Sequence, residues 1–104
     1  MIKKMEIKEL QKQAEEIINK IDSKLEFTHD NKNLILHLTE ELGEISKQIL
    51  NPGLKRQETD IENLKEEIAD VILLISKLAN NNNIDIEEAI KNKIEKLKLR
   101  HNIE

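Results

Sequence analysis

The chain has 104 residues, a length that suits one domain and is too short for two ordinary ones, so we expect residues 1–104 to form a single domain. Charged residues make up 37% of the chain, and the net charge of −4 argues against a nucleic acid polymer as partner, because such binding needs a basic face. There is no cysteine, which excludes disulfides and thiolate zinc sites and agrees with a reducing compartment.

Neither a secretion signal nor a membrane span is visible in the sequence. The opening stretch MIKKMEIKELQKQ lacks the apolar core of a signal peptide, and no apolar run reaches the length needed to cross a membrane. We therefore expect a soluble, cytoplasmic protein without a membrane partner.

Apolar residues recur at helical spacing along the chain, and no segment shows the alternation of a strand, which predicts an all-α fold. The cluster Asn51-Pro52-Gly53 predicts the end of the second helix, and the run of asparagines at 80–83 predicts the end of the third. Asp85 with Glu88 three residues later is typical of a capping box, which would start the fourth helix. The predicted helices span residues 6–22, 31–50, 58–80 and 86–101.

The predicted third helix contains the unbroken apolar run Val71-Ile72-Leu73-Leu74-Ile75. A surface helix of a four-helix bundle needs only one apolar stripe, whereas this run is apolar on every side. A second copy of the chain is the simplest cover for the additional side. We therefore expect a four-helix bundle-type fold assembled as a homodimer or homotetramer, with the third helix central to the assembly.

Two similar acidic stretches, TEELGEI and KEEIADV, lie on the second and third predicted helices. In each stretch two acids three residues apart share a helix face, as Glu41 does with Glu44 and Glu67 with Asp70. An antiparallel hairpin would bring the two pairs together, where the four carboxylates would repel one another. An oxygen-preferring divalent cation, Mg²⁺ or Mn²⁺, would relieve that repulsion and would explain a carboxylate directly before the apolar run.

A single pair of acids on a helix usually marks a solvated face, and Glu6 with Glu9 is such a pair. Two observations favour a site over plain surface charge. The pattern occurs on two consecutive helices, and Glu41 lies at the edge of the apolar stripe through Leu34 and Leu38.

The stretches EELGE and EEIADVILL resemble the E-x-x-E…E-x-x-D signature of the MazG-like all-α nucleotide pyrophosphohydrolases, and EKLKLRH is similar to the K-L-x-x-R-H ending of that family. The resemblance implies a Mg²⁺-dependent enzyme that cleaves a nucleoside triphosphate between the α and β phosphates, giving a nucleoside monophosphate and pyrophosphate. It also implies, as a frequent role, the removal of non-standard nucleotides. The metal ligands that it implies are Glu41, Glu44, Glu67 and Asp70.

The same resemblance places Lys96 and Arg100 at the phosphate-facing end of the motif. Lys93, one turn before Lys96, either extends this basic patch or marks a solvated helix end. Three acids are candidates to accept the proton of the attacking water, and the choice among them stays open. These catalytic candidates are Glu44, Glu40 and Glu66.

Each of the three histidines has a simpler explanation than metal binding. His37, one turn before Glu41, is expected to orient that carboxylate. His29 with Glu26 has the ligand spacing of di-iron bundles, but the second copy that such sites need is missing. His101 matches the family ending and is otherwise an exposed tail residue.

Further basic and aromatic residues lie near the predicted site. Lys47, Lys55 and Arg56 are close enough in sequence to the second interhelix turn to reach phosphates, although solubility is the simpler explanation for each. Phe27 is the only aromatic residue, so either it supplies the platform for a nucleobase or base discrimination is loose. The nucleobase, the sugar and the oligomer number stay open.

Three other functions are compatible with parts of the pattern. A phosphoribosyl-ATP pyrophosphohydrolase-like enzyme would share the fold and the metal use. A di-iron carboxylate protein is disfavoured by the missing second histidine motif. A non-catalytic helical interaction module would carry the acids only as surface charge.

Overall fold

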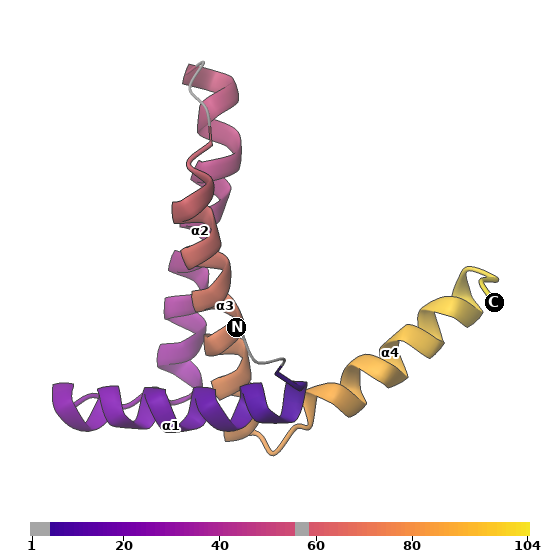
Figure 1. Ribbon diagram of the computed structural model, residues 1–104, viewed down its shortest axis with the longest axis horizontal. Helices are drawn as coiled ribbons and strands as arrows, with labels where there is room; N and C mark the ends of the chain where they lie inside the picture. The colour runs from indigo at the N-terminus through magenta and orange to yellow at the C-terminus, as the bar shows by residue number, and fades with distance from the viewer. Residues whose placement is uncertain (1–4, 56–58) are drawn as a thin grey trace.

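The computed structural model (Figure 1) describes the backbone of residues 5–55 and 59–104 and the side chains of residues 5–50 and 59–104. Within these ranges the chain is helical without strands, which confirms the all-α class. All four predicted helices are present, with ends close to those expected. They are α1 (Ile7–Leu25), α2 (Asn31–Lys55), α3 (Ile61–Asn81) and α4 (Ile86–Arg100).

Three of the helices begin after an aspartate whose carboxylate accepts a hydrogen bond from the backbone N–H three residues later. This satisfies one of the amide groups that a helix leaves unpaired at its start. The prediction for Asp85 is thereby confirmed. The cap pairs are Asp30 with Asn33 (2.8 Å), Asp60 with Asn63 (3.1 Å) and Asp85 with Glu88 (3.2 Å).

The second helix does not stop at Asn51-Pro52-Gly53, and this part of the prediction is wrong, because α2 continues to Lys55. A proline inside a helix has no N–H to donate to the carbonyl four residues earlier, here that of Gln48. The hydroxyl of Thr59 donates to this carbonyl oxygen over 3.2 Å. The carbonyl that the proline leaves without a partner is therefore satisfied from the segment that leads into α3.

The helices α2 and α3 lie side by side, and α1 crosses one end of this pair (Figure 1). Their contact forms a small aliphatic core around Leu34, Leu38 and Leu74, with Val71 and Leu78 partly buried against it. Each fully buried leucine contributes roughly 1.5–3 kcal/mol through the removal of apolar surface from water. The contact between α2 and α3 thus contains this hydrophobic cluster.

The side chain of Gln11 joins α1 to the turn between α3 and α4. Its Nε2 donates to Oδ1 of Asn80 (3.0 Å) and to the carbonyl of Ile84 (2.9 Å), and its Oε1 accepts from the N–H of Ile86 (2.9 Å). In return, Nδ2 of Asn80 donates to the carbonyl of Gln11 (2.8 Å). A buried amide whose polar atoms are paired in this way fixes where α4 begins.

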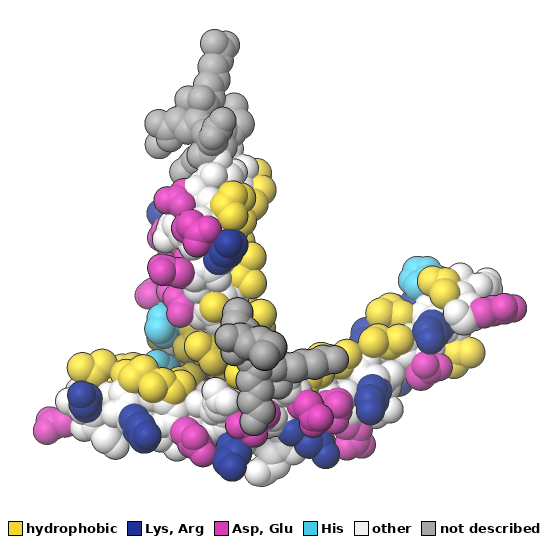
Figure 2. All heavy atoms as spheres, viewed as in Figure 1, with side chains coloured by type: hydrophobic (Ala, Val, Ile, Leu, Met, Phe, Trp, Pro, Cys, Tyr) yellow, Lys and Arg dark blue, Asp and Glu magenta, His cyan; other side chains and the backbone are white. Residues whose placement is uncertain are grey.

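From this junction α4 extends away from the other helices (Figure 1), so the single chain does not close into the expected bundle. None of the residues of α4 is buried, and Ile90, Ile94 and Leu97 are exposed along one of its faces. Apolar side chains also gather on the side of the α2–α3 pair that is turned toward α4 (Figure 2). No helix in the described ranges is long and apolar enough to cross a membrane.

Candidate active site

The two acid pairs lie on neighbouring helices, Glu41 with Glu44 on α2 and Glu67 with Asp70 on α3. Glu41 and Glu67 are partly buried, whereas Glu44 and Asp70 are exposed. Acidic side chains gather on the side of the α2–α3 pair that is turned away from α4 (Figure 2). In this view acidic side chains thus gather on one side of the pair and apolar side chains on the other.

Asp70 is exposed in the single chain, so the apolar run after it does not desolvate its carboxylate. Leu74 is buried, but Ile72 and Ile75 are 45% and 46% exposed, so this part of α3 keeps a side in contact with water. Asp70 would therefore need a cation because the other carboxylates repel its charge, and not because it is buried.

The pKa of Glu41 depends on acids of both pairs. Burial raises the pKa of the Glu41 carboxyl, and the negative charge of Asp70 raises it further. His37 acts in the opposite direction and lowers this pKa, while Glu67 and Glu44 add smaller increases. All the other acids of the predicted set therefore act on Glu41, and two of them do so from the neighbouring helix.

Glu67 has an oxygen atom without a partner. Its Oε1 accepts a hydrogen bond from Nδ2 of Asn63 over 3.2 Å, but its Oε2 is buried and unpaired among the described residues. Leaving such an atom unsatisfied costs about 1–3 kcal/mol, and more when it carries charge. A cation, or a donor from a ligand, would supply the missing interaction.

The four acids fit in part the divalent cation that the sequence predicts. Their carboxylate oxygens are the donors that Mg²⁺ and Mn²⁺ prefer, and both the raised pKa of Glu41 and the unpaired oxygen of Glu67 would be relieved by a positive charge. Within the described residues, however, no three such side chains are already arranged to hold a metal ion. The charge and donor type fit a cation, whereas the present arrangement is not a closed site.

His37 lies beside the partly buried acid of its own helix. Its Nε2 is 3.6 Å from Oε1 of Glu41, which is close enough for a charge interaction and too long for a hydrogen bond. His37 is thus close to Glu41, as predicted, but does not hydrogen-bond it in this structure. His37 also stacks on His29 with ring centroids 5.8 Å apart, and His29 meets the edge of Phe27 at 5.0 Å.

A cavity of about 440 Å³ opens beside this row of rings. Its walls are mostly apolar, and Glu40 contributes a carboxylate. Of the other catalytic candidates, Glu66 is exposed on α3 and does not line this cavity. The cavity is lined by Leu25, Phe27, His29, Leu36, His37 and Glu40, with Asn33 beside them.

The predicted phosphate-binding residues are not near the acids within one chain. Lys93, Lys96 and Arg100 are exposed on α4, and the acidic face of the α2–α3 pair is turned away from that helix (Figure 2). His101 caps the end of α4, where its N–H bonds the carbonyl of Leu97 over 3.0 Å.

The profile of the MazG nucleotide pyrophosphohydrolase domain matches residues 29–103, which include α2, α3, α4 and both acid pairs. The chain belongs to the MazG family. Among curated proteins, none matches the chain.

MazG membership confirms the resemblance seen in the sequence and assigns the chain to a family of nucleotide pyrophosphohydrolases. The match begins at His29, so α1 lies outside it although α1 packs on α3. The contacts that attach α1 to the MazG core were not found by sequence analysis.

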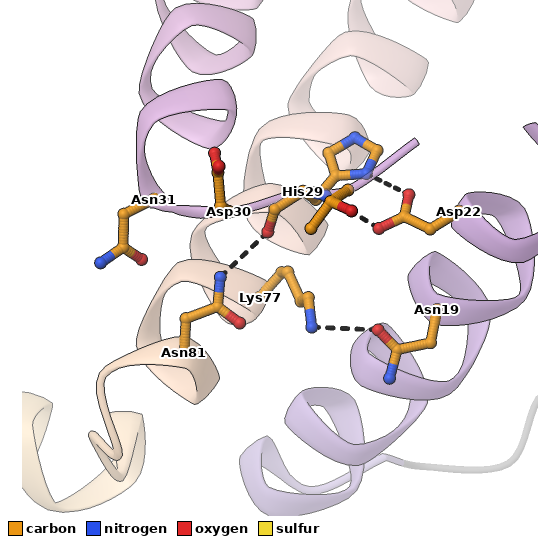
Figure 3. Close-up of a pocket in the computed structure, with 8 residues that line it drawn as sticks. Asn19, Asp22, His29, Asp30, Asn31, Lys77 and Asn81 are labelled. Carbon is orange, nitrogen blue, oxygen red and sulfur yellow. Dashed lines mark hydrogen bonds and ion pairs between the residues drawn. The ribbon is translucent and has the colours of Figure 1, made fainter. Parts of the chain in front are cut away.

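One group of these contacts surrounds a polar cavity of about 370 Å³ between α1 and the ends of α2 and α3 (Figure 3). Lys77 is buried on α3, and its Nζ donates to Oε1 of Glu15 (2.8 Å) and to Oδ1 of Asn19 (3.0 Å). On the other side of the cavity, Asp22 accepts from both the backbone N–H and the ring of His29. These polar groups bond one another, so we interpret the cavity as a joint between α1 and the MazG core.

The structure describes some of the other residues singled out in the sequence. His29, whose spacing from Glu26 is that of di-iron bundles, pairs with Asp22. Lys47 lies 3.5 Å from Glu44 in an exposed ion pair. The Lys55 side chain and Arg56 lie outside the described residues.

Proposed function

We propose that this MazG domain is a Mg²⁺-dependent nucleoside triphosphate pyrophosphohydrolase, with Mn²⁺ as the other cation that would serve. It would cleave between the α and β phosphates and release a nucleoside monophosphate and pyrophosphate. We also propose that its role is to remove non-standard nucleotides from the cellular pool.

The observation that supports this proposal most directly is the raised pKa of Glu41, because the acids that raise it lie on both α2 and α3. Burial and the charge of Asp70 act first, and Glu67 and Glu44 add to them. Such convergence of like charges destabilises the chain when no ligand is bound, and sites of this kind are typical of functional regions.

The four acids would hold the cation together, with Glu41 and Glu44 from α2 and Glu67 and Asp70 from α3. When bound, Mg²⁺ would withdraw negative charge from the oxygens of the triphosphate. The acids would hold the cation beside the triphosphate, whose oxygens they would otherwise repel, and one carboxylate would take the proton of the attacking water. Glu44 and Glu66 are the candidates for this role outside the apolar cavity, and Glu40 is the candidate within it.

The leaving pyrophosphate needs positive charge at the open side of the site. Lys93, Lys96 and Arg100 carry such charge, but on a helix that extends away from the acids of its own chain. We propose that the chain works as a homodimer or homotetramer, in which the exposed apolar faces of α3 and α4 are covered by another copy. In that assembly the basic residues would act on the site of a neighbouring subunit.

The proposal is tested by incubating the purified protein with Mg²⁺ and a panel of standard and modified ribo- and deoxyribonucleoside triphosphates. We expect release of pyrophosphate and monophosphate, lost in Glu41→Gln and in Asp70→Asn. Release of orthophosphate would move the cleavage point and contradict the proposal. No release from any nucleotide would favour a non-catalytic helical interaction module, and selective turnover of phosphoribosyl-ATP would reassign the substrate.

A further inference from the structure

We infer that Asp22 on α1 is a positioning residue for substrate binding, because it holds His29 in the row of rings on which the nucleobase would stack. On this inference, which rests on the proposed function, α1 takes part in substrate binding although it lies outside the MazG match. We therefore expect that loss of the Asp22 carboxylate weakens the binding of nucleotides without slowing the chemical step.

The apolar cavity of about 440 Å³ has the lining of a site for a flat ring. Leu25, Phe27 and Leu36 are each close to half exposed or more, and a heterocyclic base placed beside them would cover apolar surface that now meets water. His37 also lines this cavity and lies 3.6 Å from Glu41. A base bound there would direct its 5′ phosphates toward the acids of α2 and α3, so we name it the base cavity.

His29 is the middle member of the row of rings that lines the base cavity. Its ring stacks on that of His37, with centroids 5.8 Å apart, and meets the edge of the Phe27 ring at 5.0 Å. The same side chain also lines the polar cavity at the joint of α1 (Figure 3). A change in the orientation of this one ring at the joint would therefore alter the surface on which a base stacks.

Asp22 bonds both ring residues of the segment that follows α1. Its backbone carbonyl accepts from the N–H of Phe27 (3.0 Å), and its carboxylate accepts from the N–H of His29 (2.9 Å) and from Nδ1 of the His29 ring (Figure 3). Because an ionised carboxylate only accepts hydrogen bonds, Nδ1 carries the ring proton in this pair. Asp22 therefore fixes the position, the orientation and the tautomer of the ring.

The pair of Asp22 and His29 is shielded from solvent and supported by α3. The side chains of His29 and Asp22 are 12% and 14% exposed, so water competes little for the bond between them. Nδ2 of Asn81 donates to the carbonyl of His29 over 3.0 Å, so both polar groups of the His29 backbone are bonded. A ring fixed in this way loses little conformational freedom when a base stacks on it. Stacking is tolerant of base identity, so we expect the same effect for nucleotides of any base.

Asp22→Asn tests this role, because the amide keeps the size of the side chain but offers one acceptor oxygen in place of two. KM should rise roughly three- to tenfold, the effect of ordering one side chain on binding, while kcat stays unchanged. Glu15→Gln weakens the same joint through Lys77 and should keep the wild-type KM, as should Glu16→Gln, an exposed acid of α1. An equal rise of KM in Asp22→Asn and Glu15→Gln would overturn the inference, because it would assign the effect to the joint as a whole.

The tautomer of His29 gives a second reading that does not depend on the variant. The chain has only three histidines, so NMR of protein labelled with ¹⁵N in the imidazole rings can follow each of them. In the neutral ring of the wild type we expect the proton of His29 at Nδ1, and Asp22→Asn should move it toward Nε2, because an amide can donate to Nδ1. A neutral wild-type ring that carries its proton at Nε2 would overturn the inference even if Asp22→Asn did not fold.

Nucleosides without phosphates separate this inference from the proposed function, because their binding needs neither metal nor hydrolysis. Cytidine, uridine, adenosine and guanosine should move the ring signals of His29 and His37, and Asp22→Asn should require roughly three- to tenfold more nucleoside for the same shift. Turnover with equal KM in the wild type and Asp22→Asn would overturn the role of Asp22 and leave the function intact. Nucleoside binding that Asp22→Asn weakens, in a protein that hydrolyses no nucleotide, would support this role and contradict the function. Nucleosides that move neither ring signal would overturn the inference in either case.

Discussion

Nε2 of His37 lies 3.6 Å from Oε1 of Glu41, and these two residues join the apolar cavity to the acidic face of the α2–α3 pair. They are one helical turn apart, so the rigid backbone of α2 sets their spacing. A ligand that contacts both therefore needs no movement of one helix relative to another. This arrangement lets separate substitutions test the base cavity and the acids.

Glu41→Gln should stabilise the metal-free protein at neutral pH. The pKa of Glu41 is raised above its ordinary 4.5 by burial and by Asp70, so the folded chain holds this proton more tightly than the unfolded chain does. The free energy of unfolding of the wild type should accordingly fall as pH rises through the interval above 4.5, and the variant should lack this fall. Urea denaturation in chelator between pH 4 and pH 7 measures the difference.

Addition of Mg²⁺ should reverse the order of these two proteins. A cation bound by the folded state raises the Tm of the wild type with concentration, and Glu41→Gln should respond far less. A variant less stable than the wild type in chelator would contradict the proposed repulsion. Glu62→Gln, an exposed acid of α3, is the control and should change neither curve.

Because of the ion pair between Lys77 and Glu15, the stability of the fold should depend on pH in the acidic range. The hydrogen bond from Lys77 lowers the pKa of the Glu15 carboxyl, so its contribution is present above the ordinary 4.5 and is lost as pH falls through the lowered value. Glu15→Gln should therefore cost stability at pH 7, by less than about 1 kcal/mol because Glu15 is partly exposed, and much less at a pH below the lowered pKa. Equal losses at both pH values would assign the effect to packing.

Gln11→Leu should destabilise the fold by about 2–4 kcal/mol, because the N–H of Ile86 and the carbonyl of Ile84 would be left without their present partner. Thermal unfolding measures the loss. Hydrogen exchange at the Ile86 amide should also become faster than in the wild type. Gln13→Leu is the matched control on the exposed face of α1, and a comparable loss there would mean that the buried bonds contribute little.

Phe27→Ala should raise KM for every nucleotide by roughly tenfold, the effect of losing one stacked ring, without changing the ratio between bases. Phe27→Tyr keeps the ring and should behave like the wild type. A change in base preference in the alanine variant would show that Phe27 discriminates between bases in addition to stacking on them. Steady-state kinetics with nucleotides that differ in the base measure both KM and the ratio between bases.

Ile72→Glu should dissociate the proposed oligomer. Ile72 is 45% exposed on α3, and a charge there would have to be desolvated when a second copy packs against it. Sedimentation velocity should show a smaller species than the wild type at equal concentration. Lys65→Glu places the same charge on an already polar position of α3 and should leave the assembly unchanged. A wild type that is monomeric at all concentrations would contradict the proposal.

The sequence was sufficient to predict the helices and the two acid pairs, because both depend on local patterns. Helical periodicity and capping aspartates depend on neighbours within a few residues, and Asp85 was predicted on this basis. The end of α2 was wrong because its proline is compensated by Thr59, a residue from the next segment. No local pattern indicates such a bond.

The joint between α1 and the rest of the chain could not be predicted for the same reason. Gln11 and Lys77 are polar residues on helices, and their sequence neighbours give them no visible role. Their partners are 58 to 75 residues away in the chain. The one available signal was the position of Lys77 between the buried Leu74 and Ala79, where a lysine without a partner would be costly.

The position of Gln11 has a consequence for the reach of the basic residues on α4. This side chain sets the direction in which α4 departs, and α4 has 15 residues, which corresponds to roughly 22 Å at 1.5 Å per residue. A rotation of about 10° at the junction would thus displace the far end of α4 by about 4 Å, more than the length of a hydrogen bond. Evolution could therefore adjust the reach of the basic residues by substitutions in α1, outside the matched region, while the acids stay unchanged.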